Sequence, residues 1–274
     1  LLPAKSGAFK RWAEGVAAYA RSLRLLREID YWRSVEAVAV LSLPGALCSE
    51  SSGEGEVDRV ADARDQELQL SPEETATLLA VARAADPPYR VSDLLLAALA
   101  QALHALSGCE QTPIMLEGHG REPIVEGVEV SRTVGWFTTV FPFILNATAT
   151  QTRDAVRQAV REELARVPQR GIGYGILRYL TPPALRQGHG FDRNPRISFN
   201  YLGEYGFDPG QLGMQAESDI APYRSSDRAL LLYDLAFNAI VEGGRLHLYV
   251  AYASGRFADA TIRTLLDSLR TFLL

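Results

Sequence analysis

The sequence predicts a mixed α/β protein of the α+β kind, in which helices and strands follow one another without regular βαβ alternation. Apolar residues recur at helical spacing in several segments, and short apolar or aromatic runs bounded by glycine and proline lie between them. No segment of the chain repeats another.

The first part of the chain is predicted to be mainly helical. Apolar residues from Phe9 to Ile29 recur at helical spacing and predict a helix over 8–34, and a short apolar run over 37–43 ends at Pro44. The acidic stretch 50–74 begins with many serines and glycines, which favours an exposed connector over a docking surface. Ser71, followed by proline and then glutamate, predicts a capped helix start. A further helix over about 92–106 is apolar nearly all round and should be buried.

Strands and helices are mixed in the remainder of the chain. The pattern predicts strands over 113–116, 134–145 and 196–202, the second ending at Pro142 or shortly after it, and a hairpin of strands 230–241 and 245–253 around Glu242-Gly243-Gly244. Helices are expected over 152–167 and from about 258 to the end, a glycine-rich segment over 171–175 and a long loop over 203–228.

Composition excludes several classes of function. The 274 residues are 47% hydrophobic and 22% charged with a net charge of −5, and no basic cluster suggests a nucleic-acid partner. Cys48 and Cys109 lie in no CxxC or Cys/His spacing, so neither a disulfide framework nor a metal site is expected. No apolar run approaches the ~20 residues of a membrane span. We expect a cytoplasmic protein with no membrane contact, and the uncapped ends suggest a piece of a longer polypeptide.

The densest group of ionisable residues is Glu117-Gly118-His119-Gly120-Arg121-Glu122, at the end of the predicted strand 113–116. Glycines on both sides of His119 allow a sharp turn, and catalytic groups often lie where an element ends. Burial near apolar residues would raise the pKa of Glu117 toward neutrality, which suits a general base. His119 is expected to orient its neighbours, and Arg121 and Glu122 to hold the turn.

Other candidate motifs have simpler explanations. His104 lies in an apolar helix, His247 in a hairpin strand and His189 in a glycine-flanked loop, and a structural or surface role is favoured for each. The glycines of 171–175 do not have the GxGxxG spacing of a nucleotide-binding loop.

Five motifs stand together in the order and approximate spacing of one known family. They are Asp93-Leu94-Leu95-Leu96-Ala97-Ala98-Leu99, Glu117-Gly118-His119-Gly120-Arg121-Glu122, Arg132-Thr133-Val134-Gly135-Trp136-Phe137-Thr138-Thr139, Gly171-Ile172-Gly173-Tyr174-Gly175 and Phe199-Asn200-Tyr201-Leu202-Gly203. The chain thereby resembles the epimerization domains of nonribosomal peptide synthetases, and the resemblance spans nearly its whole length.

The resemblance implies a chloramphenicol-acetyltransferase-like fold of two α/β lobes that meet at a tunnel. Residues 1–68 would be the end of the N-terminal lobe with a connector, and 69–274 the C-terminal lobe. The substrate would be an aminoacyl or peptidyl thioester on the phosphopantetheine arm of a carrier protein, inverted at Cα from L to D. The partners would be that carrier domain and neighbouring synthetase domains, and this domain itself would bind no cofactor.

The resemblance also implies roles for single residues. Glu117 matches the catalytic glutamate of the family, and His119, Arg121, Trp136, Tyr174 and Asn200 would bind or support the substrate. Tyr174 and Asn200 have a packing or backbone-satisfying role as their alternative. The partner of the glutamate in the family is a histidine of a His-His-x-x-x-Asp-Gly motif. No two histidines are adjacent here, so that motif is expected upstream, and the 274 residues alone should be inactive.

Two alternatives to an epimerase remain. A condensation domain would form peptide bonds, would tolerate Glu117→Gln and would need a second, acceptor carrier. A degenerate member would only dock a carrier or a tailoring enzyme, and an altered upstream histidine motif would support it.

Overall fold

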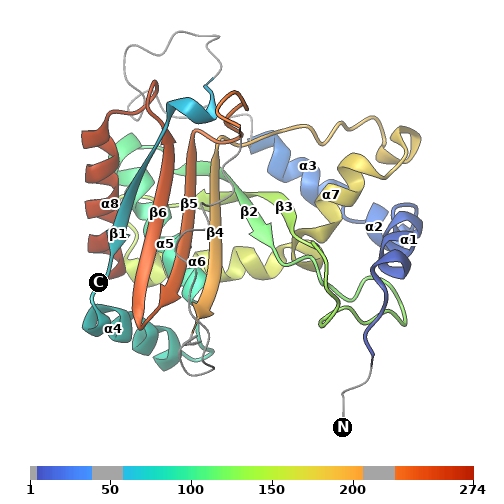
Figure 1. The fold of residues 1–274 in the computed structure, drawn as a ribbon, viewed down its shortest axis with the longest axis horizontal. Helices are drawn as coiled ribbons and strands as arrows, with labels where there is room; N and C mark the ends of the chain where they lie inside the picture. Colours follow the sequence, from blue (N-terminus) through green and yellow to red (C-terminus); the bar gives the residue numbers. More distant parts are fainter. Residues whose placement is uncertain (1–4, 39–57, 206–225) are drawn as a thin grey trace. The chain divides into compact units, whose positions relative to one another are not determined.

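The computed structural model describes residues 5–38, 58–205 and 226–274 (Figure 1). The chain divides into two compact units. Unit 1 comprises Leu1–Leu41, Pro113–Ile144 and Arg161–Pro195, and unit 2 comprises Ser42–Thr112, Leu145–Val160 and Arg196–Leu274. The predicted apolar run 37–43 and the front of the acidic stretch lie largely outside the described residues, as does most of the loop 203–228. The lobe boundary at residue 68 stays a prediction.

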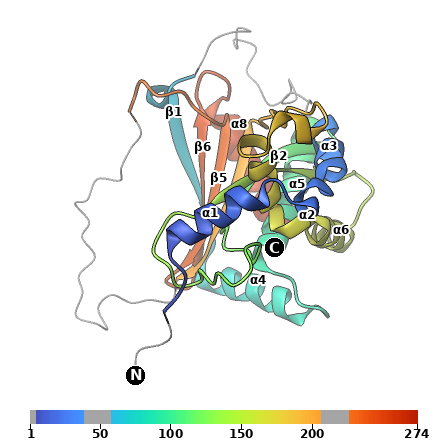
Figure 2. The same cartoon turned by 90° about the vertical axis from the view of Figure 1, so that its right-hand side faces the viewer.

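Unit 1 begins with three helices where the sequence predicts one. They are α1 (Phe9–Tyr19), α2 (Leu23–Leu26) and α3 (Ile29–Val38), the blue helices of Figure 2. The single helix over 8–34 is therefore wrong. Ser22 adopts an extended backbone, and its hydroxyl accepts a hydrogen bond from the Leu25 amide. A serine at the N-cap favours the start of a new helix, because its hydroxyl accepts a hydrogen bond from a first-turn amide that has no carbonyl partner within that helix.

The glycine-rich segment of unit 1 is also helical. A short 3₁₀ turn η2 (Pro168–Gly171) leads into α7 (Ile172–Tyr179), and a second one, η3 (Pro183–Arg186), follows. Gly171 caps α7 with a φ of +88°, a left-handed conformation that favours glycine. The segment is therefore a helix start.

Unit 2 contains the strands β1 (Ala63–Gln69), β4 (Ile197–Tyr205), β5 (Leu235–Glu242) and β6 (Arg245–Ala253), preceded by the 3₁₀ turn η1 (Val60–Asp62). The strands β4 and β5 are parallel, whereas β6 is antiparallel to both β5 and β1. With β2 (Gln111–Gly118) and β3 (Thr139–Asn146), the full strand order is β1-β6-β5-β4-β2-β3, which is a mixed sheet. Gly243 and Gly244 take positive φ in the tight β5–β6 connection, which confirms the predicted hairpin, although its first strand begins at Leu235 and not at residue 230.

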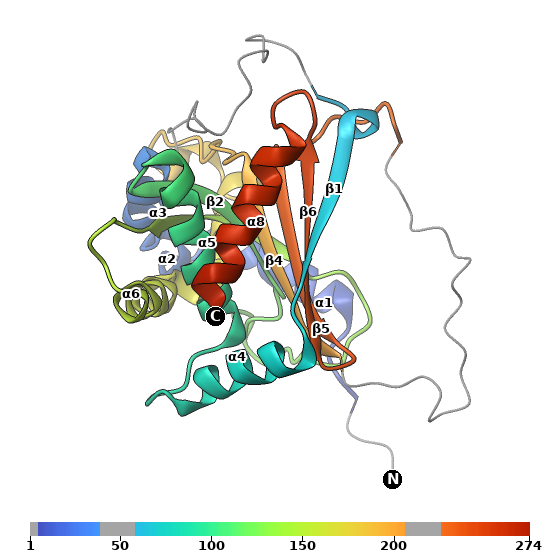
Figure 3. The ribbon, with the colours of Figure 1, turned by 90° about the vertical axis from the view of Figure 1, so that its left-hand side faces the viewer.

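Three helices of unit 2 confirm their predictions. They are α4 (Pro72–Ala84), α5 (Val91–Ser107) and α8 (Asp259–Leu273). Ser71 and Glu74 form the reciprocal cap of α4, with hydrogen bonds of 3.2 and 2.8 Å. Every residue of α5 from Asp93 to Leu103 is buried, as its apolar circumference predicts. The apolar face of α8 packs against α5 and β1 (Figure 3).

Three further elements have residues in both units. They are β2 (Gln111–Gly118), β3 (Thr139–Asn146) and α6 (Arg153–Arg166). The strand predicted over 134–145 begins later, at Thr139, and it continues past Pro142 to Asn146. Pro142 does not end the strand because β3 is the edge of the sheet, where a missing amide need not interrupt a ladder on both sides.

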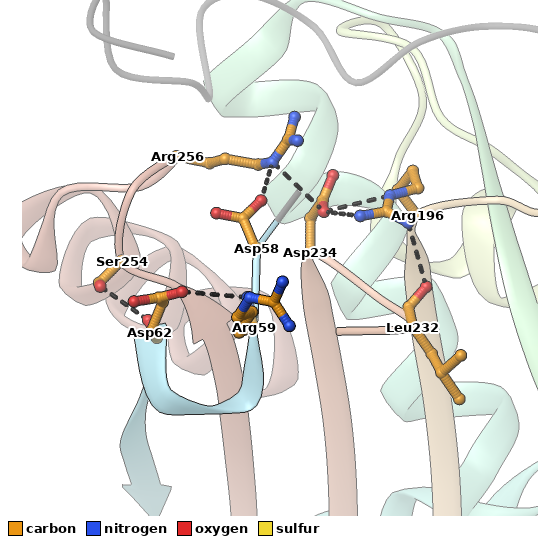
Figure 4. Close-up of polar contacts among 8 residues, drawn as sticks. All are labelled: Asp58, Arg59, Asp62, Arg196, Leu232, Asp234, Ser254 and Arg256. Atoms are coloured by element: carbon orange, nitrogen blue, oxygen red, sulfur yellow. Dashed lines mark hydrogen bonds and ion pairs between the residues drawn. The ribbon is translucent and has the colours of Figure 1, made fainter. Parts of the chain in front are cut away.

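An ionic cluster closes one end of the unit 2 sheet (Figure 4). Asp234 is 2% exposed and accepts from Arg196 Nε at 3.1 Å, while Arg256 Nε lies 3.5 Å from the same carboxylate. Arg256 also pairs with Asp58, at the start of the segment that leads into β1. The cluster thus ties the beginnings of β1 and β5 to the segment that follows β6.

Candidate active site

Strand β2 carries Glu117 to the end of a buried element. The residues from Thr112 to Leu116 are all buried, and the side chain of Glu117 is exposed at the point where the strand ends. Packed atoms nearby displace part of the water around the carboxylate, and this desolvation raises the pKa of Glu117 above its ordinary value. The direction is the expected one, but the expected burial of Glu117 is wrong, because the side chain emerges from the buried strand and is exposed.

The turn after Glu117 depends on two glycines. Gly120 has a φ of +66°, and a Cβ at this position would lie 1.6 Å from the Phe137 carbonyl oxygen. A Cβ on Gly118 would lie 3.0 Å from Thr139 Oγ1 and 3.5 Å from the Arg170 carbonyl oxygen. The backbone of the turn therefore lies directly against neighbouring backbone, which only glycine at position 120 allows.

His119 makes two polar contacts within the turn. Its Nδ1 accepts a hydrogen bond of 2.9 Å from the Arg121 amide, and its Nε2 lies 3.2 Å from Glu122 Oε1. The two contacts fit a ring that is protonated at Nε2 and donates to Glu122. Glu122 is 7% exposed, and its other oxygen lies 3.9 Å from Arg170 Nε. These contacts are compatible with an orienting role for His119 and a structural role for Glu122, and both roles stay predictions.

Arg121 holds the following loop. Its guanidinium donates to the carbonyl oxygens of Val130, Thr133 (2.9 Å) and Gly135 (3.4 Å), and it stacks 4.0 Å from the centre of the Phe137 ring. A planar guanidinium can serve several carbonyls at once, which an ammonium cannot do in the same geometry. Arg121 therefore contacts the loop that follows the turn, and its expected supporting role for the substrate stays a prediction.

Trp136 lies on this loop and is 82% exposed, next to Val134 at 96%. The adjacent Phe137 points inward and packs against Phe9 and Trp12, with ring centroids 5.2 and 5.9 Å away. The inward Phe137 fixes the loop, and the role of Trp136 stays a prediction.

Tyr174 and Asn200 lie in different units. Tyr174, on α7, is 1% exposed, and its hydroxyl donates to Glu36 Oε1 at 2.7 Å. Burial, together with that bond, raises the pKa of Tyr174 and favours the packing alternative that the sequence leaves open. Asn200 is half-buried on β4 of unit 2, opposite Asn238 of β5. Substrate binding by either residue stays a prediction.

Sequence reasoning missed one neighbour of this site, Arg170. It contributes both a guanidinium near Glu122 and a carbonyl oxygen beside Gly118. Its positive φ of 52° lies in a 3₁₀ turn whose sequence gives no local indication of the contact.

Across residues 5–38, 58–205 and 226–274, no group of three or more His, Cys, Asp and Glu side chains could hold a metal ion. Within the same ranges no helix combines the length and apolar character that a bilayer crossing demands.

Comparisons with known proteins match this chain over all or nearly all of its length. A family model for the condensation domain matches residues 1–274. Tyrocidine synthase 1 of Brevibacillus parabrevis is 34% identical over 293 residues, covering 100% of this chain and 25% of that protein. Bacitracin synthase 3 of Bacillus licheniformis is 32% identical over 273 residues, which cover 98% of this chain and 4% of that protein. The chain therefore spans a quarter or less of these two relatives.

Among solved structures, an epimerization domain is similar to this chain in both sequence and fold. The epimerization domain from the third module of tyrocidine synthetase B matches with a TM-score of 0.85 and 33% identity. The match covers all of this chain and 60% of that structure.

Proposed function

Because the chain belongs to the condensation-domain family of nonribosomal peptide synthetases, we propose that it epimerizes an aminoacyl or peptidyl thioester held on a carrier protein. The match to a solved epimerization domain confirms the predicted chloramphenicol-acetyltransferase-like fold class and supports this branch of the family. The proposed reaction converts L to D at Cα by removing a proton and returning one to the opposite face.

The observation that carries the proposal is the environment of Glu117. A Cα–H beside a thioester is a weak acid, so its removal needs a positioned base whose pKa is closer to neutrality than that of a free carboxylate. Glu117 lies at the end of a buried strand, and desolvation raises its pKa. The turn behind it is held by His119 and by the close approach of Gly120 to Phe137. This support would keep the carboxylate in one geometry during proton transfer.

Return of a proton to the opposite face needs a second donor. The family resemblance assigns this role to a histidine of the His-His-x-x-x-Asp-Gly motif, which is not among these 274 residues. We therefore propose that Glu117 serves one face of the Cα and a group outside this sequence serves the other. The phosphopantetheine arm of the carrier would deliver the substrate, and neighbouring synthetase domains would accept the product.

The second candidate is peptide-bond formation, which the description of the matching family model favours. The two reactions differ in what they need and in what they produce. Condensation joins two carrier-bound groups, whereas epimerization changes one carrier-bound group and needs no acceptor carrier.

The test uses the natural polypeptide that contains these residues, with its carrier loaded with an L-aminoacyl group. The amino acid is released after incubation and resolved by chiral chromatography, with and without a second loaded carrier. We expect a mixture of D and L forms without the second carrier, and the same mixture when the reaction starts from the D form. A product that stays wholly L, together with a dipeptide when the second carrier is present, would establish condensation instead.

A further inference from the structure

Unit 1 contains a buried carboxyl group that the proposed proton transfer does not use. Glu28, between α2 and α3, is 6% exposed, and its Oε2 accepts a hydrogen bond of 3.1 Å from Trp32 Nε1. Its Oε1 has no hydrogen-bond partner among the described residues, and the same holds for the buried hydroxyl of Tyr19. Burial is the main cause of the raised pKa of Glu28, opposed by the Trp32 hydrogen bond and by Arg24. A buried acid is a costly residue to keep, unless its side chain has a specific contact to make.

That contact is with the glycine-rich start of α7. A Cβ on Gly173 would lie 2.0 Å from Glu28 Oε2 and 2.8 Å from Cδ. Gly173 is itself helical and has no positive φ, so backbone conformation does not require glycine there. The space that its missing side chain leaves is filled by the Glu28 carboxyl group. This gives the second glycine of Gly171-Ile172-Gly173 a role that nucleotide binding does not explain.

A series of contacts leads from Glu28 to the backbone beside Glu117. The Trp32 indole, held by Glu28, packs against Phe141 of β3 with ring centroids 6.0 Å apart. Phe141 lies so close to Gly171 that a Cβ there would be 2.0 Å from the ring. The same ring lies 3.7 Å from the Cβ position of Gly118, the residue after Glu117. Each step is a packed contact, so a shift of the indole would be passed to the turn.

We infer that Glu28 is a positioning residue, which locks Trp32 and the start of α7 so that Phe141 holds the Glu117 turn in its working geometry. The inference rests on the proposed function. Glu28 acts here as a hydrogen-bond acceptor of fixed shape and has no contact with substrate. A glutamine keeps that shape and the acceptor, whereas an alanine removes both.

The test measures kcat and KM for Cα proton exchange of a carrier-bound L-aminoacyl thioester, per folded molecule, in the natural polypeptide. Glu28→Ala and Trp32→Phe each break the hydrogen bond, and we expect kcat to fall about tenfold with KM nearly unchanged, because a misplaced base slows proton transfer. Glu28→Gln should stay within about twofold of the wild type, since a neutral acceptor suffices.

Gly173→Ala provides an independent arm. Alone, it should lower kcat as Glu28→Ala does, because the new methyl group displaces the carboxyl group. In the Glu28→Ala background the same change should have little further effect, because the space has been vacated. Such non-additivity is expected of residues in direct contact.

Each outcome separates the two proposals. If Glu117→Gln abolishes exchange while Trp32→Phe and Gly173→Ala keep full kcat, the positioning role is wrong and the proposed function stands. A Glu28→Gln variant as slow as Glu28→Ala would also refute the role, because it would show that the charge matters. If the wild type exchanges no proton, the proposed function fails and the inference fails with it. Should Glu28→Ala not fold, the Trp32→Phe and Gly173→Ala results decide.

Discussion

The turn that follows Glu117 can be tested by comparing two glycines with nearly the same backbone conformation. Gly120 and Gly127 have φ values of +66° and +69°. A Cβ on Gly127 meets nothing within 4 Å, whereas one on Gly120 would lie 1.6 Å from the Phe137 carbonyl oxygen. Alanine at either site has the same conformational cost, and only alanine at 120 also collides with backbone.

The magnitudes follow from this difference. A left-handed backbone costs an L-residue about 1–2 kcal/mol, which is the expected loss of unfolding free energy for Gly127→Ala. An added methyl group in a packed site costs a further ~1–3 kcal/mol. A collision with a carbonyl cannot be relieved by a rotamer change, so we expect Gly120→Ala to lose about 4–5 kcal/mol in total.

The assay is urea denaturation of both variants and of the wild type, in which unfolding is monitored by circular dichroism and by tryptophan fluorescence. The difference between the two variants should be about 3 kcal/mol. Equal losses for Gly120→Ala and Gly127→Ala would refute the close approach of the turn to Phe137, and with it the account of how Glu117 is supported.

Three further predictions concern stability. Thr75→Val should lower the free energy of unfolding in urea by about 1–3 kcal/mol, because Thr75 Oγ1 accepts a hydrogen bond of 2.9 Å from the buried amide of Leu246. The control Thr77→Val, at an exposed site, should change the unfolding free energy little. A loss for Thr75→Val no larger than that of the control would contradict the hydrogen bond. Asp234→Ala should lower the free energy of unfolding by about 2 kcal/mol. The loss is smaller than for a fully buried ion pair, because the arginine partners of Asp234 stay in contact with water. An unchanged melting temperature in a thermal scan would refute the stabilising role of the cluster. Because the pKa of Glu28 is raised, this carboxyl group binds a proton more tightly in the folded state than in the unfolded state. Protonated Glu28 therefore stabilises the fold at acid pH, and this contribution is lost as the pH rises from the ordinary carboxyl range through the pKa of the folded state. The unfolding free energy of Glu28→Gln relative to wild type should therefore increase from acid to neutral pH, and a pH-independent difference would contradict the burial of this group.

Elements with local determinants could be predicted from the sequence. The cap of α4 lies within the four residues from Ser71 to Glu74, and the hairpin turn lies within Gly243 and Gly244. The contact of His119 with Glu122 also lies within one turn, so the sequence places the two residues close together. In each case the residues that make the interaction are adjacent in the sequence.

Features that depend on distant partners could not be predicted. Strand β1 was not predicted because five of its seven residues are charged or are glutamine, and only Leu68 is buried. Its pairing depends on β6, far along the chain. Position 173 needs a glycine because the carboxyl group of Glu28 occupies the space where a side chain would lie. The sequence around either residue does not indicate this contact. The single helix over 8–34 failed because helical spacing continued across Ser22, whose capping bond ends the periodicity.

Deuterium uptake at Cα of a carrier-bound L-aminoacyl thioester in D₂O tests the central claim most directly. The natural polypeptide is compared with Glu117→Gln and with Glu126→Gln, which makes the same charge change at an exposed site of the segment that follows the turn. The account predicts exchange in the wild type and in Glu126→Gln, and its collapse by at least about a hundredfold in Glu117→Gln, because the base is lost. Exchange that persists in Glu117→Gln would contradict the assignment of Glu117 as the base.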